Sequence, residues 1–464
     1  MSAIDPRRKR ATENPDHSHR NHVPAPADAE IEQRLNDLVL PAVYAEMEYY
    51  RKLGLRNRLL NLPVMVALVL TLIWRRVPGV CALQDLLARE RVLWTRPRRV
   101  AQSSLTQRFL TFPAVLFERV LYRVLARLPE RIARRTRPLP TGLAAVRERF
   151  SALYACDGTT LEALFRKLQA LQERDDAPLA GHLLAVCDLV THLPVKVWYA
   201  EDPSTNDKAF GADLLAWLPG NSLSVFDLGF FAFPFFDALT AAGRYFVTRL
   251  RAKTSYTVAR VLLDTPRMRD RIVHLGLYRS NPSEHPVRLI EVQFDRTWYS
   301  YLTNVLDPQR LNVLEVVQLY DCRWHIETAF LLVKRLLDLA YLWVGSLNGV
   351  QLQVWATWLY YAILIDLCDG IADQLQVPLD RISVEMVARG LYYYVGAKAQ
   401  DYTGSAVEYF AEPLNCQDLG IVKRLDRRSK RPAQLAQLRE ALRAAGVIPP
   451  AAPSSGPLTS PGFR

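Results

Sequence analysis

The sequence has few cysteines and no closely spaced pair of them. Its six cysteines are scattered over 464 residues, and none belongs to a C-x-x-C pair. A structural zinc site needs ligands a few residues apart, and a disulfide scaffold needs a short chain that is dense in cysteine. Neither fits, so we expect reduced, mostly buried thiols in a cytoplasmic protein.

Three common motifs of nucleotide and zinc chemistry are missing as well. The sequence has no G-x-x-x-x-G-K-[ST] loop, no G-x-G-x-x-G opening a helix and no H-E-x-x-H. These motifs mark phosphate-cradling loops, dinucleotide sites and zinc hydrolases. Nothing therefore points to those three functions.

The apolar runs are too short for a membrane span. The segment Leu59–Trp74 is rich in Leu and Val, but Asn61, Pro63 and Thr71 interrupt it. A span needs about 20 apolar residues, so we predict a buried helix that opens near Pro63. A membrane protein that uses this segment is the alternative. The first residues are polar and charged, so we also expect no secretory signal peptide.

Charge of one sign is in excess. Lys and Arg number 59 against 47 Asp and Glu, and the net charge is +12. A basic surface raises the local concentration of polyanions such as DNA or an anionic membrane. A soluble basic protein with no such partner is the alternative.

The first third of the chain is basic and has helical periodicity. We predict a disordered basic arm over residues 1–29 and a helical DNA-binding domain over residues 30–140. The predicted helices are Ile31–Tyr50, Pro63–Arg75, Leu83–Arg91, Val100–Phe109 and Pro113–Arg127. The third and fourth suggest a helix-turn-helix. Its second helix would offer DNA the side chains of Gln102, Ser103, Ser104, Gln107 and Arg108. An ordinary helical bundle with solvated charges is the alternative.

An α/β region follows, and two of its predicted strands end at an aspartate. The apolar run Leu153–Cys156 precedes Asp157, and Ser224–Phe226 precedes Asp227. Further predicted strands are His182–His192, Val195–Tyr199, Tyr245–Arg251, Ser255–Leu263 and Tyr299–Asn304, with Arg271–Tyr278 and Val287–Phe294 as a hairpin. A long helix is expected over Val313–Leu342, more helix to about Val395, and a flexible tail over residues 441–464.

Four polar residues of that long helix share one face. On a helical wheel, Tyr320, Arg323, Glu327 and Lys334 fall on a stripe about 60° wide, opposite an apolar side. One carboxylate among two cations and a phenol suits a scissile phosphate, because Glu would hold metal while Arg and Lys hold phosphate oxygens. An amphipathic helix with solvated charges is the alternative.

The spacing Y-x2-R-x3-E-x6-K resembles that of the DDE transposases of bacterial insertion sequences, in the insertion sequence 4 family. Supporting motifs are Asp157-Gly158-Thr159-Thr160-Leu161, Asp227-Leu228-Gly229-Phe230-Phe231, the segment 243–251 and the segment 301–308. The resemblance covers about Phe150 to Ile371.

The resemblance implies an α/β fold: an RNase H-like catalytic core with a β-rich insertion, preceded by a helical N-terminal domain. The catalytic domain would span residues 141–440, with the insertion at about 245–305. Asp157, Asp227 and Glu327 would be the catalytic residues and would hold two Mg²⁺ ions, for which Mn²⁺ is an expected substitute. Phosphodiester cleavage needs an activated oxygen nucleophile and a stabilised leaving oxyanion, and two divalent ions do both.

The implied function is a DNA transposase that cuts an insertion sequence from flanking DNA. Water would nick the transposon end, and the freed 3′-hydroxyl would attack the opposite strand and later the target. Tyr320, Arg323 and Lys334 would grip phosphates. The implied partners are double-stranded DNA and a second copy in a synaptic dimer, at the nucleoid in the cytoplasm and with no membrane. A catalytically inactive DNA-binding relic and an RNase H-like nuclease are the alternatives.

Two further features suggest DNA contact. Arg249, Arg251 and Lys253 alternate along a predicted strand, which would project them on one face as a phosphate track; a solvated edge strand is the alternative. Trp298 and Trp324 have rings that suit stacking on a flipped base, although such tryptophans are more often core residues.

Overall fold

The computed structural model describes residues 28–161, 181–336, 346–423 and 429–449. The chain divides into two compact units, each built from segments far apart in sequence. The first comprises Met1–Leu139, Asp157–Asp207 and His325–Lys423, and the second comprises Pro140–Cys156, Lys208–Trp324 and Arg424–Arg464. The predicted domain boundaries stay predictions, and most of the predicted arm and tail lies outside the described residues.

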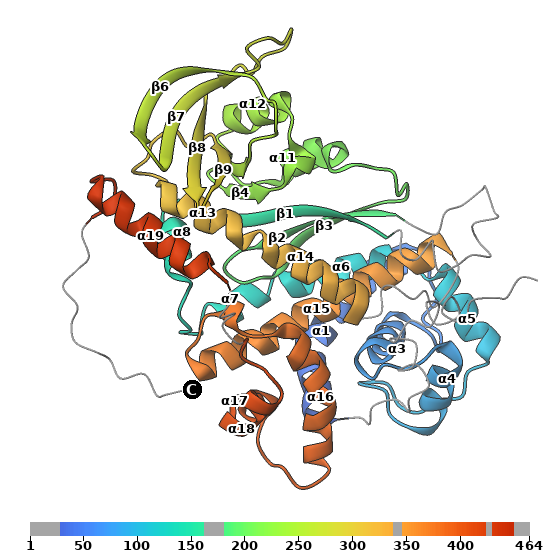
Figure 1. Ribbon diagram of the computed structural model, residues 1–464. Coiled ribbons are helices and arrows are strands. Elements are labelled where there is room, and N and C mark those ends of the chain that lie inside the picture. Colours follow the sequence, from blue (N-terminus) through green and yellow to red (C-terminus); the bar gives the residue numbers. More distant parts are fainter. Residues whose placement is uncertain (1–27, 162–180, 337–345, 424–428, 450–464) are drawn as a thin grey trace, which may run out of the picture. The chain divides into compact units, whose positions relative to one another are not determined.

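The first unit is mainly helical (Figure 1). Its helices are α1 (Ala29–Ala45), α2 (Met47–Lys52), α3 (Leu62–Trp74), α4 (Val80–Arg89), α5 (Gln102–Thr111), α6 (Val115–Leu125), α7 (Leu128–Ile132), α15 (Leu347–Leu375), α16 (Val384–Lys398), α17 (Ala406–Ala411) and α18 (Pro413–Asp418). The strands β2 (His182–Asp188) and β3 (Pro194–Ala200) form an antiparallel pair in the same unit.

Helix α15 is the core of the first unit, and α3, α5, α6, α16 and α17 pack against it. Among the described helices, only α15 is long and apolar enough to cross a membrane, and 94% of its most apolar window is buried inside the protein. Helix α3 is the predicted helix near Pro63. Asn61 caps its first turn by accepting a hydrogen bond from the backbone N–H of Val64 at 3.2 Å, and Pro63 suits a helix start because it lacks an N–H.

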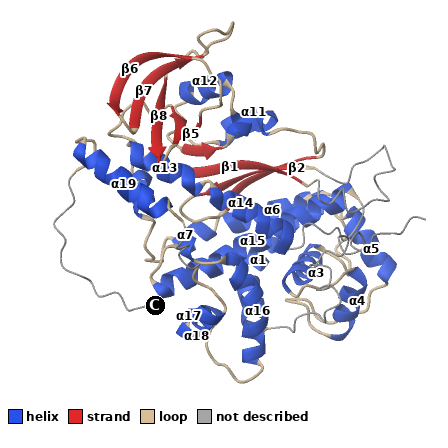
Figure 2. Ribbon diagram, in the orientation of Figure 1, coloured by secondary structure: helices blue, strands red, loops and turns tan. Residues whose placement is uncertain are grey.

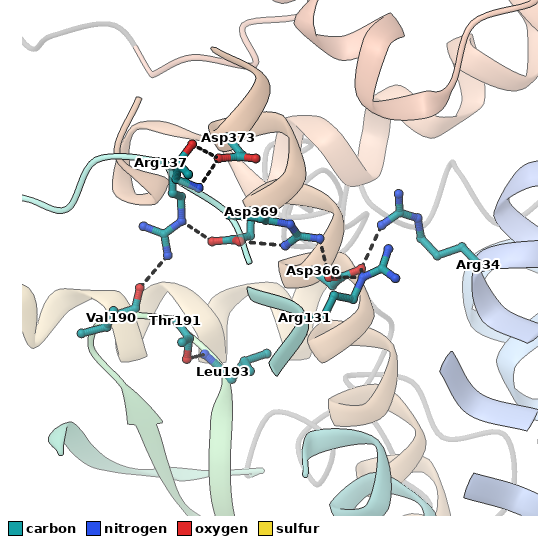
Figure 3. Close-up of polar contacts among 11 residues, drawn as sticks. Arg34, Arg131, Arg137, Val190, Thr191, Leu193, Asp366, Asp369 and Asp373 are labelled. Atoms are coloured by element: carbon teal, nitrogen blue, oxygen red, sulfur yellow. Dashed lines mark hydrogen bonds and ion pairs between the residues drawn. The ribbon is translucent and has the colours of Figure 1, made fainter. Parts of the chain in front are cut away.

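Two fully buried aspartates of α15 are held by arginines from the N-terminal segment (Figure 3). Asp366 accepts hydrogen bonds from Arg34, Arg131 and Arg135 at 2.9, 2.9 and 2.6 Å. Asp369 accepts from Arg135 at 2.7 Å and from Arg137. A buried carboxylate must be paired to be tolerated, so these contacts fix the segment before residue 139 to the core helix.

The strands form one mixed sheet in the order β3-β2-β1-β4-β5-β9-β8-β7-β6. The strands not yet bounded are β1 (Leu153–Thr160), β4 (Leu223–Phe226), β5 (Tyr245–Arg249), β6 (Tyr256–Thr265), β7 (Met268–Leu275), β8 (Val287–Phe294) and β9 (Thr297–Thr303). Strand β4 is parallel to both β1 and β5. The neighbouring strands in the series β5-β9-β8-β7-β6 all pair antiparallel. Figure 2 shows the strands β6, β7 and β8 side by side. The predicted hairpin is confirmed as β7 and β8, while the β6–β7 hairpin was not predicted.

The remaining helices belong mainly to the second unit. They are α8 (Thr141–Arg147), α11 (Gly211–Trp217), α12 (Phe233–Ala241), α13 (Val313–Cys322) and α19 (Arg431–Ala444), while α14 (Trp324–Leu331) starts at the boundary of the two units. Short 3-10 helices lie at Asp207–Phe210, Leu228–Phe230 and Leu379–Arg381.

Two of the predicted helices are wrong in detail. The first helix is interrupted at Glu46, whose buried carboxylate binds Arg119 and Arg123. The long helix over 313–342 is interrupted at Arg323, where the backbone N–H bonds to the Tyr320 carbonyl three residues back, at 3.2 Å. It then widens to a π-helical turn at Leu332–Leu336, so a wheel at constant pitch does not describe the stripe. Its last residues, 337–342, lie outside the described residues.

The helix-turn-helix prediction is also wrong. Helices α4 and α5 contact each other, but residues 90–101 join them. A helix-turn-helix has a turn of about 3–4 residues. The connection instead contains a small β-bridge between Val92 and Thr95.

Candidate active site

Asp157 and Asp227 each follow the last paired residue of two neighbouring parallel strands. The pairing of β1 with β4 joins Cys156 to Phe226, and each aspartate is the next residue in its chain. Both side chains are half-buried. Each carboxylate accepts a hydrogen bond from the following backbone N–H, from Gly158 at 2.9 Å and from Leu228 at 2.6 Å. Strand β4 ends just before Asp227, as predicted, whereas β1 continues past Asp157 to Thr160.

Glu327 lies in the first turn of α14 and is half-buried. It belongs to the first unit together with Asp157, whereas Asp227 belongs to the second. Across the described residues, no three His, Cys, Asp or Glu side chains form a group that could hold a metal ion. The carboxylate oxygens of Asp157, Asp227 and Glu327 are the type of ligand that Mg²⁺ prefers. Their convergence on an ion stays a prediction.

Within the second unit, Tyr320 interacts electrostatically with Asp227 and with two other predicted DNA-binding side chains, Arg323 and Arg249. Burial raises the pKa of Tyr320; the charge of Asp227 raises it further, while Arg323 and Arg249 lower it. The guanidinium of Arg323 lies 5.7 Å from the Tyr320 ring centroid and 5.4 Å from that of Trp324. The Tyr320 hydroxyl is therefore influenced by one proposed metal ligand and by two cations.

The predicted track of Arg249, Arg251 and Lys253 is not one strand face. Strand β5 ends at Arg249, and Lys253 has φ of 62° in the following turn. Arg251 instead donates to the Leu228 carbonyl at 3.1 Å, next to Asp227. The strand is shorter than predicted because a turn replaces its last residues, so the alternation assumed for the three side chains does not occur.

The two tryptophans differ in exposure. Trp324 is 60% exposed, so it is not a core residue. Trp298 is half-buried and lies under the guanidinium of Arg269, 4.9 Å from its ring centroid. Stacking on a flipped base stays a prediction for both.

Comparison with known proteins decides the family of this region. Residues 154–363 match the family described as "Transposase DDE domain". This part of the chain is a transposase DDE domain. Its mixed α/β architecture, with a large mixed sheet preceded by helices, is accordingly the RNase H-like fold that was predicted. The matched range includes Asp157, Asp227, Glu327 and the residues 320–334.

Two other comparisons add little. No curated protein matches the sequence. The chain is similar to a solved structure described as the cryo-EM structure of the piggyBac transposase synaptic complex with hairpin DNA, at 12% identity and a TM-score of 0.36, covering 91% of this chain and 84% of that one. At that score the likeness carries no argument.

Lys334 of the DDE domain contacts the strand that carries Asp157. Its ammonium group donates to the Thr160 carbonyl at 2.7 Å and to the Thr159 hydroxyl. It lies in the π-helical turn, and such turns occur frequently at functional sites. The predicted phosphate contact stays a prediction, but the observed contact gives Lys334 a part in fixing the end of β1.

An open basic groove lies outside the DDE domain, in the helical part of the first unit. Its volume is about 940 Å³, and α5 forms one side of it. Among the described residues that line it, none is acidic. Its polar lining comprises Arg56, Arg58, Arg99, Ser104, Gln107 and Arg108.

The groove includes two arginines that the sequence pattern did not mark as DNA-binding. Ser104, Gln107 and Arg108 were predicted to face DNA, but Arg56 and Arg58 of the loop before α3 were not. The pattern Arg56-Asn57-Arg58 after Gly54 could have indicated an exposed basic loop, since short basic segments beside a glycine are commonly exposed. Its proximity to α5 could come only from the fold.

Proposed function

We propose that this chain is a DNA transposase of the insertion sequence 4 family that excises an insertion sequence and joins its 3′ ends to target DNA. The observation that carries the proposal is the register of β1 and β4. It leaves Asp157 and Asp227 one residue beyond the paired Cys156 and Phe226, within the residues that match a transposase DDE domain. Two acidic side chains that each follow the last paired residue of adjacent parallel strands suit metal-dependent phosphoryl transfer.

We propose Asp157, Asp227 and Glu327 as the ligands of two Mg²⁺ ions, with Mn²⁺ as a substitute. When bound, the ions would supply an activated nucleophile and stabilisation of the leaving oxygen. The half-burial of all three carboxylates supports this assignment, because a partly dehydrated site strengthens the attraction between carboxylate and cation.

The side chains around Asp227 would bind the scissile phosphate. Arg323 and Arg249 provide positive charge that acts on the Tyr320 hydroxyl. Tyr320 is 9% exposed and its pKa is raised, so its hydroxyl stays protonated at neutral pH and can donate a hydrogen bond to a phosphate oxygen. The exposed Trp324 next to Arg323 would offer a stacking surface to an unpaired base.

The basic groove would dock duplex DNA away from the cleavage site. Four arginines without an acidic neighbour in the lining are complementary to a phosphate backbone. The net charge of +12 favours the same partner. The protein would work at the nucleoid in the cytoplasm, as a synaptic dimer on paired transposon ends.

The test is a plasmid excision and joining assay with purified full-length protein. The wild type should release the element and join its 3′ ends to target DNA, while Asp157→Asn, Asp227→Asn and Glu327→Gln should do neither. Asp264→Asn is the matched control, because Asp264 is an acidic residue of β6 whose side chain is 62% exposed. A wild type that binds DNA without cutting it would indicate an inactive relic, and cleavage without joining would indicate a nuclease.

A further inference from the structure

Gly158, the residue after Asp157, is packed against a histidine and an aspartate that the proposed mechanism does not use. A Cβ at position 158 would lie 2.7 Å from Nε2 of His182 and 2.7 Å from Cγ of Asp207. Both distances are far inside van der Waals contact. Only a glycine at this position therefore allows the two side chains to reach the backbone of β1.

His182 and Asp207 form a hydrogen-bonded pair. Nε2 of His182 donates to Oδ1 of Asp207 at 2.9 Å, since an ionised carboxylate has no proton to give. The side chains are only 8% and 17% exposed. His182 is the first residue of β2, and Asp207 begins the 3-10 helix Asp207–Phe210. The pair thus links two segments that are distant in sequence.

The contact lies one residue from the proposed metal ligand. The Asp157 carboxylate accepts its hydrogen bond from the Gly158 N–H at 2.9 Å, so any movement of Gly158 moves that donor. Three residues further on, the Leu161 N–H donates to the Gly181 carbonyl at 2.8 Å. The end of β1 is therefore held beside the start of β2 both by the backbone and by the pair.

We propose that His182 and Asp207 are positioning residues that fix Gly158, and through its N–H the carboxylate of Asp157, in the orientation needed to bind a divalent cation. The inference rests on the proposed function, because it takes Asp157 as a ligand. The residues that hold a metal ligand in place commonly change metal affinity by about 10–100-fold when they are removed. The glycine at position 158 is the feature of this arrangement that is visible in the sequence.

The experiment measures Mn²⁺ binding to full-length protein by electron paramagnetic resonance, without DNA. Asp207→Ala and Gly158→Ala should each weaken Mn²⁺ binding by about tenfold or more, the first by removing the pair and the second by displacing it. Asp207→Asn keeps an oxygen that accepts from His182, so its affinity should stay within about threefold of the wild type. Asp213→Ala, at an exposed aspartate of α11, is the control and should bind as the wild type does.

Two further readouts separate positioning from mere stability. Hydrogen exchange of residues 153–161, measured without metal, should be faster in Asp207→Ala than in Asp207→Asn. The melting temperatures of these two variants should be alike. Unchanged Mn²⁺ affinity in folded Asp207→Ala and Gly158→Ala would overturn the inference, and so would a loss that Asp207→Asn shares in full. If the proposed function itself were wrong, the wild type would fail to excise and join DNA in the plasmid assay, a failure distinct from a loss of Mn²⁺ affinity confined to the variants.

Discussion

The ammonium group of Lys334 donates a hydrogen bond to the backbone carbonyl of Thr160, 2.7 Å away. The lysine lies seven residues beyond Glu327 on the helical segment, and Thr160 ends the strand that carries Asp157. Asp157 and Glu327 are the two proposed metal ligands of the first unit. The contact between Lys334 and Thr160 therefore links the helical segment of Glu327 to the strand of Asp157.

Removing this contact should loosen the end of β1. Lys334→Met keeps a side chain of similar length but loses both hydrogen bonds, so we expect DNA nicking to fall by about 100-fold and hydrogen exchange of residues 153–161 to increase. Lys334→Arg should recover part of the activity. Lys430→Met, at a lysine with a 78% exposed side chain, is the control. Unchanged exchange in Lys334→Met would show that the lysine does not fix the strand.

The ionic cluster on α15 should dominate the stability of the helical unit. Asp369 is fully buried and accepts from two arginines, so Asp369→Ala leaves Arg137 and part of Arg135 without a counter-ion. We expect the free energy of unfolding to fall by about 3–5 kcal/mol, measured by urea titration. Asp373→Ala, at a half-buried position one turn later, should cost much less. Equal losses in the two variants would contradict this account of the cluster.

The basic groove should contribute DNA affinity without contributing chemistry. The double variant Arg56→Gln, Arg58→Gln should bind duplex DNA of every sequence more weakly, and by a similar factor. The plot of log binding constant against log salt concentration should become less steep by about two, which is about one for each lost phosphate contact. Fluorescence anisotropy at several salt concentrations measures both. Arg389→Gln, at an exposed arginine of α16, is the control. A salt slope equal to that of the wild type would remove the groove from the DNA interface.

Stability should decline in acid because of a histidine pair. The rings of His192 and His325 lie 4.4 Å apart. Burial lowers the pKa of His325 to about 4, against the favourable charge of Asp380, and burial with the neighbouring His325 lowers the pKa of His192. The unfolded chain binds protons near pH 6.5 and the folded chain does not. The stability from neutral His325 is thus complete above about pH 6.5 and is lost as the pH falls to about 4. His325→Phe should flatten this part of the unfolding free energy against pH, and an unchanged slope would contradict the assignment.

The end of β4 could be predicted from the sequence because a short apolar run followed by an aspartate is a local signal. The same signal located the start of β1 but not its end, because the strand continues through Asp157 to Thr160. The break in the helix at Arg323 could not be predicted, because the apolar periodicity of the sequence continues through it. The break consists of one backbone hydrogen bond that spans three residues, from the Arg323 N–H to the Tyr320 carbonyl, instead of the four of an α-helix. The groove and the His182–Asp207 pair were equally out of reach. Each joins side chains that are more than twenty residues apart, and only packing decides which of them meet.

Thiol substitution at the proposed metal ligands tests the central claim most directly. Asp157→Cys, Asp227→Cys and Glu327→Cys would be assayed for DNA nicking with Mg²⁺ and with Mn²⁺, since sulfur is a poor ligand for Mg²⁺ and a better one for Mn²⁺. We expect all three variants to be inactive with Mg²⁺ and at least one to regain nicking with Mn²⁺, while the serine counterparts at the same positions regain none. Full activity with Mg²⁺ in any one of the three would mean that this side chain holds no catalytic ion, and the three-carboxylate site would be wrong.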